Sequence, residues 1–291
     1  ASRVASIVEV LTSERAGLGE SPLWHRDEQS FYWVDINADR VLRLSPDSGS
    51  AEIVFEGIKV SALAETTDGG LLFVTSRALL AWNDGKVQQV APVSVADGTR
   101  TNDGKCDPGG RMWFGSMDLR TRDPIGSLYV FDGRTVESVE EGITLSNGLG
   151  WSADLTTMYH VDTIAANLYR YRYAQSTGTV ADREVLVDFT GFEGWPDGLA
   201  VDVDGNIWVA MYDGWCVNVF DSSGVRVHVE TLDVQRPTSV AFGGPDLSQL
   251  FVTTASQELG DEAMRAQPDA GMVLRLEPGT SGLPVGVFPH G

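Results

Sequence analysis

Histidine and cysteine are scarce in this chain, which has 4 histidines and 2 cysteines among 291 residues. Cys106 and Cys216 belong to no Cys-x-x-Cys pair and to no Cys/His spacing that closes a zinc site. No Gly-x-Ser-x-Gly segment with a histidine partner occurs either, which excludes a serine hydrolase of that type. Chemistry based on thiols, imidazoles or an activated serine is therefore not indicated.

Basic residues are also few: 21 Lys and Arg stand against 41 Asp and Glu, a formal net charge of −20. Such a surface repels a polyphosphate backbone or an anionic membrane, so we expect neither nucleic acid nor membrane as a partner. No run approaches eighteen apolar residues, and the N-terminus lacks the pattern of a signal sequence. We expect a cytoplasmic, soluble protein that is a monomer or a weak homo-oligomer and binds a small molecule.

Glycine is abundant, with 32 residues, and it punctuates an internal repeat. Each repeat has a short strand, a turn rich in Asp and Gly, and then a β-branched and aromatic run, as in Asp202–Val209. The repeats align at positions 41 to 50 residues apart, which are Glu20, Ser61, Asn102, Asn147, Asp197 and Thr238. Third and fourth strands follow in most repeats.

Six repeats of four antiparallel strands predict an all-β fold, a six-bladed β-propeller that forms a single domain over residues 1–291. The sixth repeat has little sequence left after Leu276, whereas a strand-like segment, Arg3–Leu11, precedes the first repeat. We predict that this N-terminal segment pairs with the last blade and closes the ring.

The first strands of propeller blades line the central channel, so the aligned positions are expected to converge. Glu20, Asn147 and Asp197 offer oxygen ligands, and Asn102 and Asp103 add two more. Each residue alone is typical of a turn, but a shared register at the channel indicates a cation site, because buried carboxylates need compensation. Oxygen ligands favour Ca²⁺, Mg²⁺ or Mn²⁺, while Zn²⁺ or Fe²⁺ with three protein ligands stays open.

Four motifs together resemble the family of senescence marker protein, gluconolactonase and luciferin-regenerating enzyme. The likeness extends over nearly the whole chain, in order and at matching spacings. The motifs are Gly19-Glu20-Ser21-Pro22, Arg100-Thr101-Asn102-Asp103-Gly104-Lys105, Ser146-Asn147-Gly148-Leu149 and Pro196-Asp197-Gly198-Leu199.

The resemblance implies a lactonase that depends on one divalent metal ion. By this likeness Glu20, Asn147 and Asp197 match the metal ligands, and Asp197 is also the general base. Asn102 and Arg100 match substrate contacts, with Asp103 beside them, and Asp118 stands where vertebrate members have an acidic residue that contacts sugar. The implied substrate is an aldonolactone such as glucono-, xylono-, arabino- or galactonolactone.

The residue types suit this chemistry on their own, since a cation stabilises charge on a lactone carbonyl and a carboxylate can deprotonate water. Two alternatives stay open: a phosphotriesterase that uses the same site, and a non-catalytic calcium-binding regulatory protein. Two expanded loops, Leu119–Pro124 and Ser256–Ala270, are interpreted as exposed loops or as the rim of the channel, where they would help select substrate.

Overall fold

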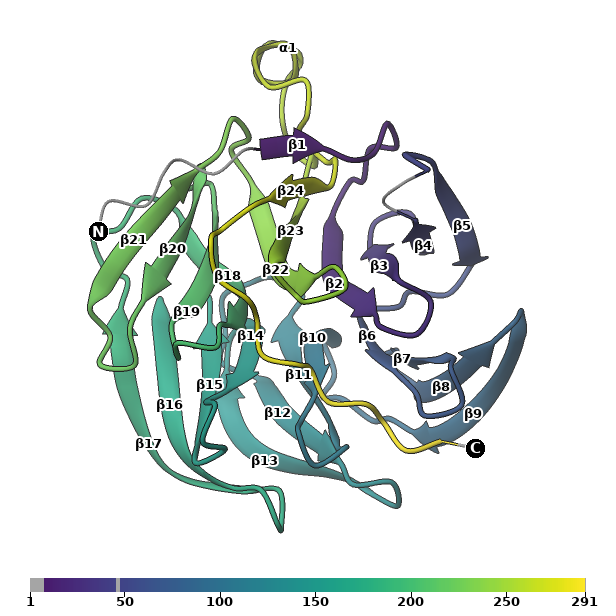
Figure 1. Cartoon of the computed structure of the whole chain (residues 1–291). Helices are drawn as coiled ribbons and strands as arrows, with labels where there is room; N and C mark the ends of the chain where they lie inside the picture. The colour runs from purple at the N-terminus through teal and green to yellow at the C-terminus, as the bar shows by residue number, and fades with distance from the viewer. Residues whose placement is uncertain (1–7, 46–47, 291) are drawn as a thin grey trace. The chain divides into compact units, whose positions relative to one another are not determined.

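The computed structural model describes residues 8–45 and 48–290 and is built almost entirely of β-strands. The strands form six four-stranded antiparallel sheets (Figure 1). The chain divides into two compact units: unit 1 contains residues 1–57 and 191–283, and unit 2 contains residues 58–190 and 284–291. Three of the sheets belong to each unit.

In each sheet of unit 1, neighbouring strands are antiparallel, and in the first two sheets they follow one another in the chain. The first sheet consists of β2 (Gly19–His25), β3 (Ser30–Asp35), β4 (Arg40–Leu44) and β5 (Ala51–Glu56). The second consists of β18 (Trp195–Val201), β19 (Ile207–Tyr212), β20 (Cys216–Phe220) and β21 (Arg226–Thr231). The third consists of β22 (Pro237–Gly243), β23 (Gln249–Thr254), β24 (Leu274–Leu276) and β1 (Val8–Val10).

Unit 2 repeats the same order of strands three times without interruption. Its first sheet consists of β6 (Ala62–Glu65), β7 (Leu71–Val74), β8 (Ala78–Asn83) and β9 (Lys86–Pro92). Its second consists of β10 (Thr99–Cys106), β11 (Met112–Asp118), β12 (Gly126–Phe131) and β13 (Val136–Ile143). Its third consists of β14 (Ser146–Trp151), β15 (Thr157–Asp162), β16 (Asn167–Ala174) and β17 (Thr179–Asp188).

The predicted pairing of the N-terminal segment with the last repeat is confirmed for the residues that the structure describes. Strand β1 adds to the outer edge of β24, with Val8 opposite Leu276 and Val10 opposite Leu274 (Figure 1). The earlier part of the predicted segment, residues 3–7, lies outside the described residues. The sheet that the sixth repeat could not complete is therefore completed from the other end of the chain.

Aromatic side chains of neighbouring sheets pack against each other within each unit. In unit 1, Phe31 stacks on Trp33 at 5.5 Å between ring centroids and on Phe251 of another sheet at 4.7 Å. In unit 2, Trp113 meets Trp151 edge-on at 6.3 Å. Burying such a ring contributes about 1.5–3 kcal/mol, so these contacts hold the sheets of one unit together.

Two buried aspartates fix the turns that join first and second strands. Asp202 accepts hydrogen bonds from the backbone N–H of Asn206 and from the indole of Trp208 at 2.9 Å. Asp107 likewise accepts hydrogen bonds from the backbone N–H of Arg111 and from the indole of Trp113, which lies six residues after Asp107. Since both carboxylates are fully buried and paired, these hairpins are rigid supports for the strands that carry the site.

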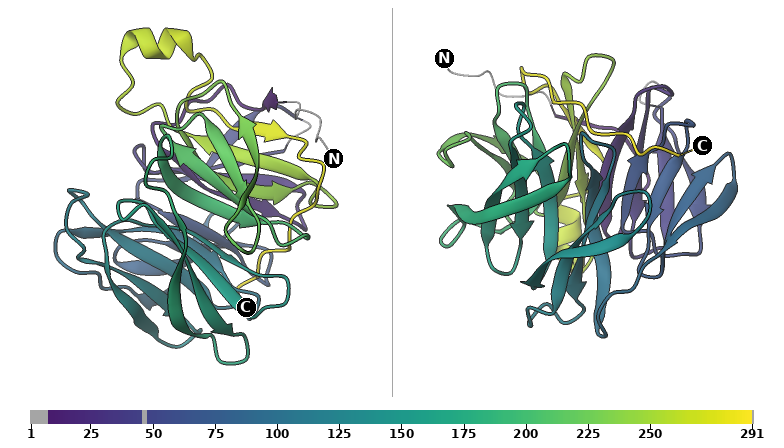
Figure 2. Two further views of the ribbon diagram at one scale, coloured as in Figure 1. Left: turned by 90° about the vertical axis from the view of Figure 1, so that its left-hand side faces the viewer. Right: turned by 90° about the horizontal axis from the view of Figure 1, so that it is seen from below.

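One element departs from the all-β prediction. A short helix, α1 (Asp261–Ala266), lies in the long loop between β23 and β24 and stands off the strands of its sheet (Figure 2). Acidic Asp261 and Glu262 lie in its first turn and Arg265 in its last, which matches the helix dipole. The segment has no apolar periodicity, so the sequence pattern does not predict a helix here.

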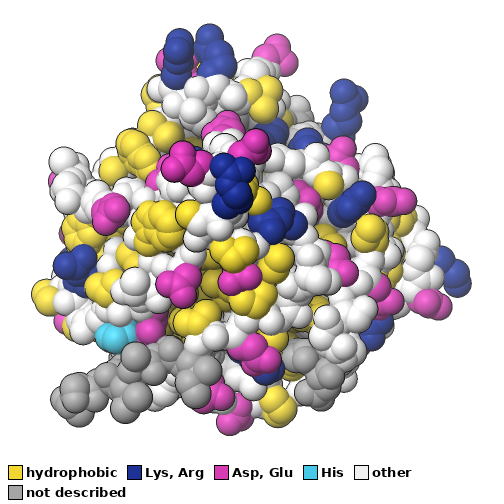
Figure 3. Space-filling view, turned by 90° about the horizontal axis from the view of Figure 1, so that it is seen from above, with side chains coloured by type: hydrophobic (Ala, Val, Ile, Leu, Met, Phe, Trp, Pro, Cys, Tyr) yellow, Lys and Arg dark blue, Asp and Glu magenta, His cyan; other side chains and the backbone are white. Residues whose placement is uncertain are grey.

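Acidic and basic side chains are interspersed on the face shown in Figure 3, where Lys and Arg form no continuous patch. Among the described residues no helix is long and apolar enough to cross a membrane.

Candidate functional site

Five of the predicted site residues lie at β-bulges, namely Glu20, Asn102, Asp103, Asn147 and Asp197. In five sheets the pairing of the first strand with the second shifts register at this point, whereas β6 pairs with β7 regularly. A bulge gives one strand an extra residue and re-aims its side chains, and bulges are frequent beside active sites. The shifts fall between Glu20 and Leu23, Thr101 and Gly104, Ser146 and Leu149, Pro196 and Leu199, and Pro237 and Ser239.

Glu20 lies at the bulge of β2 in unit 1 and is 5% exposed. Ser21, the next residue, has a φ of 49°, a left-handed conformation that costs a residue with a side chain free energy and is typical of functional bulges. The Ser21 N–H donates to Glu20 Oε2 at 3.3 Å, and the Thr238 hydroxyl of β22 donates to the Gly19 carbonyl. The backbone that presents Glu20 is therefore held from two strands.

Asp197 lies at the bulge of β18, also in unit 1, and is 5% exposed. The following glycine is required by packing: a Cβ on Gly198 would lie 1.9 Å from Ser239 Oγ and 2.7 Å from Ser239 Cα. Only a glycine lets β18 approach β22 this closely. The Asp-Gly pair therefore combines a buried carboxylate with a close contact between two sheets.

Asn147 lies at the bulge of β14 in unit 2 and is 3% exposed. A chain of side-chain hydrogen bonds runs through it. Arg100 Nη1 donates to Asn102 Oδ1 at 2.9 Å, Asn102 Nδ2 donates to Asn147 Oδ1 at 3.0 Å, and Asn147 Nδ2 donates to Thr163 Oγ1 at 2.7 Å. We call this chain of four residues the amide relay.

The amide relay has a defined direction, which starts from Arg100. A guanidinium only donates, so the oxygen of Asn102 faces Arg100. The Asn102 nitrogen then faces Asn147 and the Ser146 carbonyl, which only accepts, at 2.9 Å. The Asn147 oxygen consequently faces the Asn102 nitrogen, and the relay fixes which end of the Asn147 amide is the oxygen.

The relay also uses the hydrogen-bonding groups of the Asn102 amide. Both hydrogens of its amide nitrogen are donated to Ser146 and Asn147, and its oxygen accepts from Arg100. The structure thus brings three predicted site residues together, namely Arg100, Asn102 and Asn147, and makes Asn102 a positioning residue for Asn147. Its contact with substrate stays a prediction.

Asp103 is buried beside Lys105 on β10. Burial raises the pKa of the Asp103 carboxyl, while the Lys105 ammonium opposes this shift. Burial likewise lowers the pKa of Lys105, and the Asp103 charge opposes it. Each group thus favours the charged state of the other. Asp103 Oδ1 also accepts the Gly104 N–H at 2.7 Å, a contact within its own strand.

Asp118 ends β11 and is 1% exposed. Its carboxylate accepts backbone hydrogen bonds from Asp123 at 2.9 Å and Arg122 at 3.0 Å, which lower the pKa of the group. Asp35 and Asp162 end the second strands of their sheets and bind backbone N–H groups in the same way. The structure shows that Asp118 shapes the loop 119–124, and its predicted contact with sugar stays a prediction.

The sequence analysis missed the groups beneath the Asn147 bulge. Ser146 Oγ lies 2.8 Å from His160 Nε2, both residues are fully buried, and burial lowers the pKa of His160 to about 3. A Cβ on Gly115 would lie 1.8 Å from Ser146 Oγ, so this glycine makes room for the pair. The signal was present as a serine before Asn147, but nothing in the sequence pairs it with a histidine fourteen residues later.

The predicted ligands are, taken one by one, of the types that hard divalent cations prefer. Glu20 and Asp197 provide buried carboxylates in unit 1, and Asn147 provides an oriented amide oxygen in unit 2. Residues 8–45 and 48–290 contain no group of three His, Cys, Asp and Glu side chains placed to hold a metal. The predicted set is not of that kind, because one of its three ligands is an amide.

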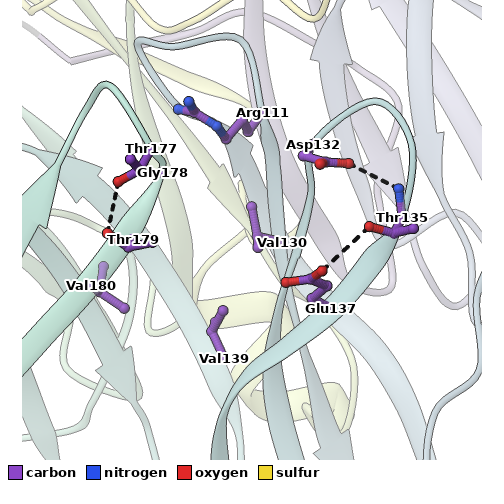
Figure 4. Close-up of a pocket in the computed structure, with 10 residues that line it drawn as sticks. All are labelled: Arg111, Val130, Asp132, Thr135, Glu137, Val139, Thr177, Gly178, Thr179 and Val180. Carbon is purple, nitrogen blue, oxygen red and sulfur yellow. Dashed lines mark hydrogen bonds between the residues drawn. The ribbon is translucent and has the colours of Figure 1, made fainter.

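A separate pocket of about 210 Å³ lies in unit 2, between the turns of β12–β13 and β16–β17 (Figure 4). None of the predicted site residues lines it. Arg111 lies at its edge, but the guanidinium is committed to Asp107 and to the carbonyls of Gln175 and Ser176. Asp132 and Glu137 bind neighbouring turn atoms instead. We assign no function to this pocket.

Solved structures similar to this chain establish its fold class. A calcium-binding protein, regucalcin, from Agrobacterium tumefaciens matches with a TM-score of 0.92 and 29% identity over 98% of this chain and 97% of that chain. A luciferin-regenerating enzyme matches with a TM-score of 0.89 and 28% identity over 98% of this chain and all of that chain. The predicted fold class, a six-bladed β-propeller, is confirmed, and each four-stranded sheet is one blade.

Sequence comparison then defines the family. Residues 18–256 match the family described as SMP-30/Gluconolactonase/LRE-like region, and the chain belongs to this family. Pentonolactonase XacC of Haloferax volcanii is 38% identical over 92% of this chain and 93% of its own length. Regucalcin of Gallus gallus is 34% identical over 95% of this chain and 96% of its own length.

Proposed function

We propose that this protein hydrolyses a sugar-acid lactone to the open acid and that it binds one divalent metal ion for this purpose. The class of enzyme, a lactonase, agrees with the names of its relatives, above all a pentonolactonase that is 38% identical over 92% of the chain. The observation that supports the proposal most strongly is that its three ligand candidates all occupy β-bulges at one register of the repeat.

In this proposal Glu20, Asn147 and Asp197 are the metal ligands. The cation would be Ca²⁺, Zn²⁺, Mg²⁺, Mn²⁺ or Fe²⁺; a similar structure is that of a protein described as calcium-binding. Bound there, it would supply Lewis-acid stabilisation of the negative charge that develops on the lactone carbonyl oxygen. The amide relay serves this role because it selects oxygen, which binds cations, over nitrogen at Asn147.

Asp197 is proposed as the general base that takes a proton from the attacking water. It is a buried carboxylate, and His160 offers no alternative base, since it is fully buried with a pKa lowered to about 3. Arg100, Asn102, Asp103 and Asp118 are proposed as the groups that surround the sugar. A small-molecule lactone is then the partner, while a monomeric or weakly oligomeric state and a cytoplasmic location remain predictions.

The deciding experiment is Asp197→Asn, which keeps the shape and one oxygen but removes the charge and the basicity. We expect kcat/KM on five- and six-carbon aldonolactones to fall by about 10²–10⁴-fold, the usual contribution of a general base. Asp204→Asn is the matched control, because Asp204 is an exposed turn residue in the same sheet. Activity of Asp197→Asn within threefold of wild type would contradict the proposal.

The same assay distinguishes the alternatives when a phosphotriester is added to the substrates and a chelator to the conditions. Turnover of the phosphotriester without any lactone turnover would favour a phosphotriesterase. Calcium binding without turnover of either would favour a regulatory calcium-binding protein. Lactone turnover that a chelator leaves unchanged would support the proposed lactonase activity and contradict the proposed metal dependence.

A further inference from the structure

A comparison of two sheets shows where Tyr212 lies relative to the bulge residue Asp197. In sheet β14–β17, Ser146 pairs with Asp162, and the next residue, Thr163, contacts the bulge residue Asn147. In sheet β18–β21, Pro196 pairs with Met211, and the next residue is Tyr212. Tyr212 therefore stands to Asp197 as Thr163 stands to Asn147, but with a much longer side chain.

The electrostatics agree with this placement. Burial raises the pKa of the Tyr212 phenol, and the negative charges of Asp213 and Asp197 add to the rise, whereas Gln257 and Arg236 oppose it. Asp197 is thus one of the charges that act on this phenol. The residue is half-buried.

A network within unit 1 holds the phenol in place. Asn37 Nδ2 donates to Gln257 Oε1 at 2.8 Å, and Gln257 Nε2 donates to the Tyr212 hydroxyl at 3.0 Å. Arg236 lies over the ring with its Cζ 5.0 Å from the centroid, and its Nε donates to Asp213 at 2.6 Å. Ring and hydroxyl are thus fixed before any ligand binds.

The direction of this network leaves one hydrogen unused. The Tyr212 oxygen accepts from Gln257, and no described residue accepts the hydrogen of the same hydroxyl. A phenol can accept and donate at once, so the group is prepared to donate to something that is not part of the protein. Because Asp197 is the proposed general base, a bound substrate is the candidate partner.

We propose that the Tyr212 hydroxyl donates a hydrogen bond to a hydroxyl oxygen of the sugar lactone, and that Asn37 and Gln257 orient it for this purpose. This inference rests on the proposed lactonase function. It makes Tyr212 a specificity residue for lactones that carry ring hydroxyls. Gln257 begins the long loop that contains α1, so the inference also gives this loop a role in recognising substrate.

The test compares a hydroxylated with an unsubstituted lactone. Tyr212→Phe removes only the hydroxyl and keeps the ring under Arg236. We expect the KM for an aldonolactone to rise about tenfold with kcat nearly unchanged, the size of one hydrogen bond, while kcat/KM for δ-valerolactone, which has no ring hydroxyl, stays within twofold of wild type. Gln257→Met, which keeps Tyr212 but removes its orienting donor, should raise the same KM by about threefold.

The possible outcomes test the role of Tyr212 and the proposed lactonase function separately. An equal loss on both lactones, or no loss on either, would overturn the role of Tyr212 while wild-type turnover still supports the lactonase. Absence of wild-type turnover on every lactone would overturn the proposed function and this inference with it. Urea unfolding of both variants shows whether a loss comes from the fold, and a midpoint equal to that of wild type is expected for Tyr212→Phe.

Discussion

Sheets β14–β17 and β18–β21 present two different solutions to the same problem. Both bulge at the residue proposed as a ligand, Asn147 in one and Asp197 in the other. The neighbour at the next register is Thr163 in the first sheet and Tyr212 in the second. Thr163 faces inward and binds the ligand residue, whereas Tyr212 is held by a loop and has a hydrogen to donate.

The chemistry of the two ligand residues explains this difference. A carboxylate has two equivalent oxygens and binds a cation in either orientation. Asp197 therefore needs no partner to determine which of its atoms faces the cation. An amide has one oxygen and one nitrogen, and only the oxygen is a ligand. Asn147 therefore requires the amide relay, which occupies Arg100, Asn102 and Thr163. In the sheet of Asp197 the equivalent position is released for another use.

The largest effect that tests this contrast is expected from Asn102→Leu. Leucine keeps the size of the side chain but removes both donors, so the Asn147 amide loses its orienting partner. We expect kcat/KM to fall about 100-fold and the affinity for a divalent cation, measured by titration calorimetry, to fall in parallel.

Tyr212→Phe is the matched change in the other sheet, and it should leave cation affinity unchanged. If Asn102→Leu retained cation affinity within threefold of wild type, the relay would not be what orients Asn147, and the two sheets would not differ in the way described.

The sequence predicted the shared register of the candidate site residues, but not their contacts. Glu20, Asn102, Asn147 and Asp197 were found because the repeat aligns them, and the structure places a bulge at each. A bulge adds one residue to one strand, which a period of 41 to 50 residues does not reveal. The aligned register was therefore correct, while its local geometry was visible only in three dimensions.

The hydrogen-bond partners of the candidate site residues are what sequence reasoning could not supply. The predicted contact of Asn102 with substrate stays a prediction, and the structure adds that its amide donates to Ser146 and Asn147, more than forty residues away. The predicted contact of Asp118 with sugar also stays a prediction, and the structure adds that its carboxylate accepts hydrogen bonds from the backbone of its own loop. Both side chains are of the expected type at the expected place. Their partners depend on packing between strands, which residue type alone does not specify.

A second difference between the two sheets concerns histidine. His160 is fully buried against Ser146 in sheet β14–β17, whereas His228 of β21 is half-buried and binds Glu230 at 2.8 Å. Burial lowers the pKa of His160 to about 3 from 6.5, so the unfolded chain binds a proton there between these values and the folded chain does not. Stability from this group is complete above pH 6.5 and is lost as the pH falls toward 3.

His160→Gln removes that titration and should flatten the pH dependence of stability. Between pH 7 and pH 5 we expect the wild-type free energy of unfolding to fall by about 2 kcal/mol more than that of the variant, from about 1.4 kcal/mol per pH unit below 6.5. Urea unfolding at the two pH values measures this difference. His228→Gln is the control from the other sheet. An unchanged pH dependence in His160→Gln would show that the buried imidazole is not the group that titrates.

The smallest effect is expected at Thr163, where the two sheets differ by a single side chain at the same register. Thr163→Val keeps the shape but removes the acceptor of Asn147 Nδ2, which lies 2.7 Å away, so one buried amide hydrogen loses this partner. A buried donor deprived of its partner costs about 1–3 kcal/mol of stability. Activity should fall only about three- to tenfold, because Asn102 still donates to the oxygen of Asn147 and the amide keeps its orientation.

Thr163→Ser retains the hydroxyl and is expected to resemble wild type in both urea unfolding and kcat/KM. A loss of activity in Thr163→Val as large as that in Asn102→Leu would mean that the nitrogen side of the amide, and not the oxygen side, determines its orientation. Thr163, and not Asn102, would then be the residue that orients the Asn147 amide.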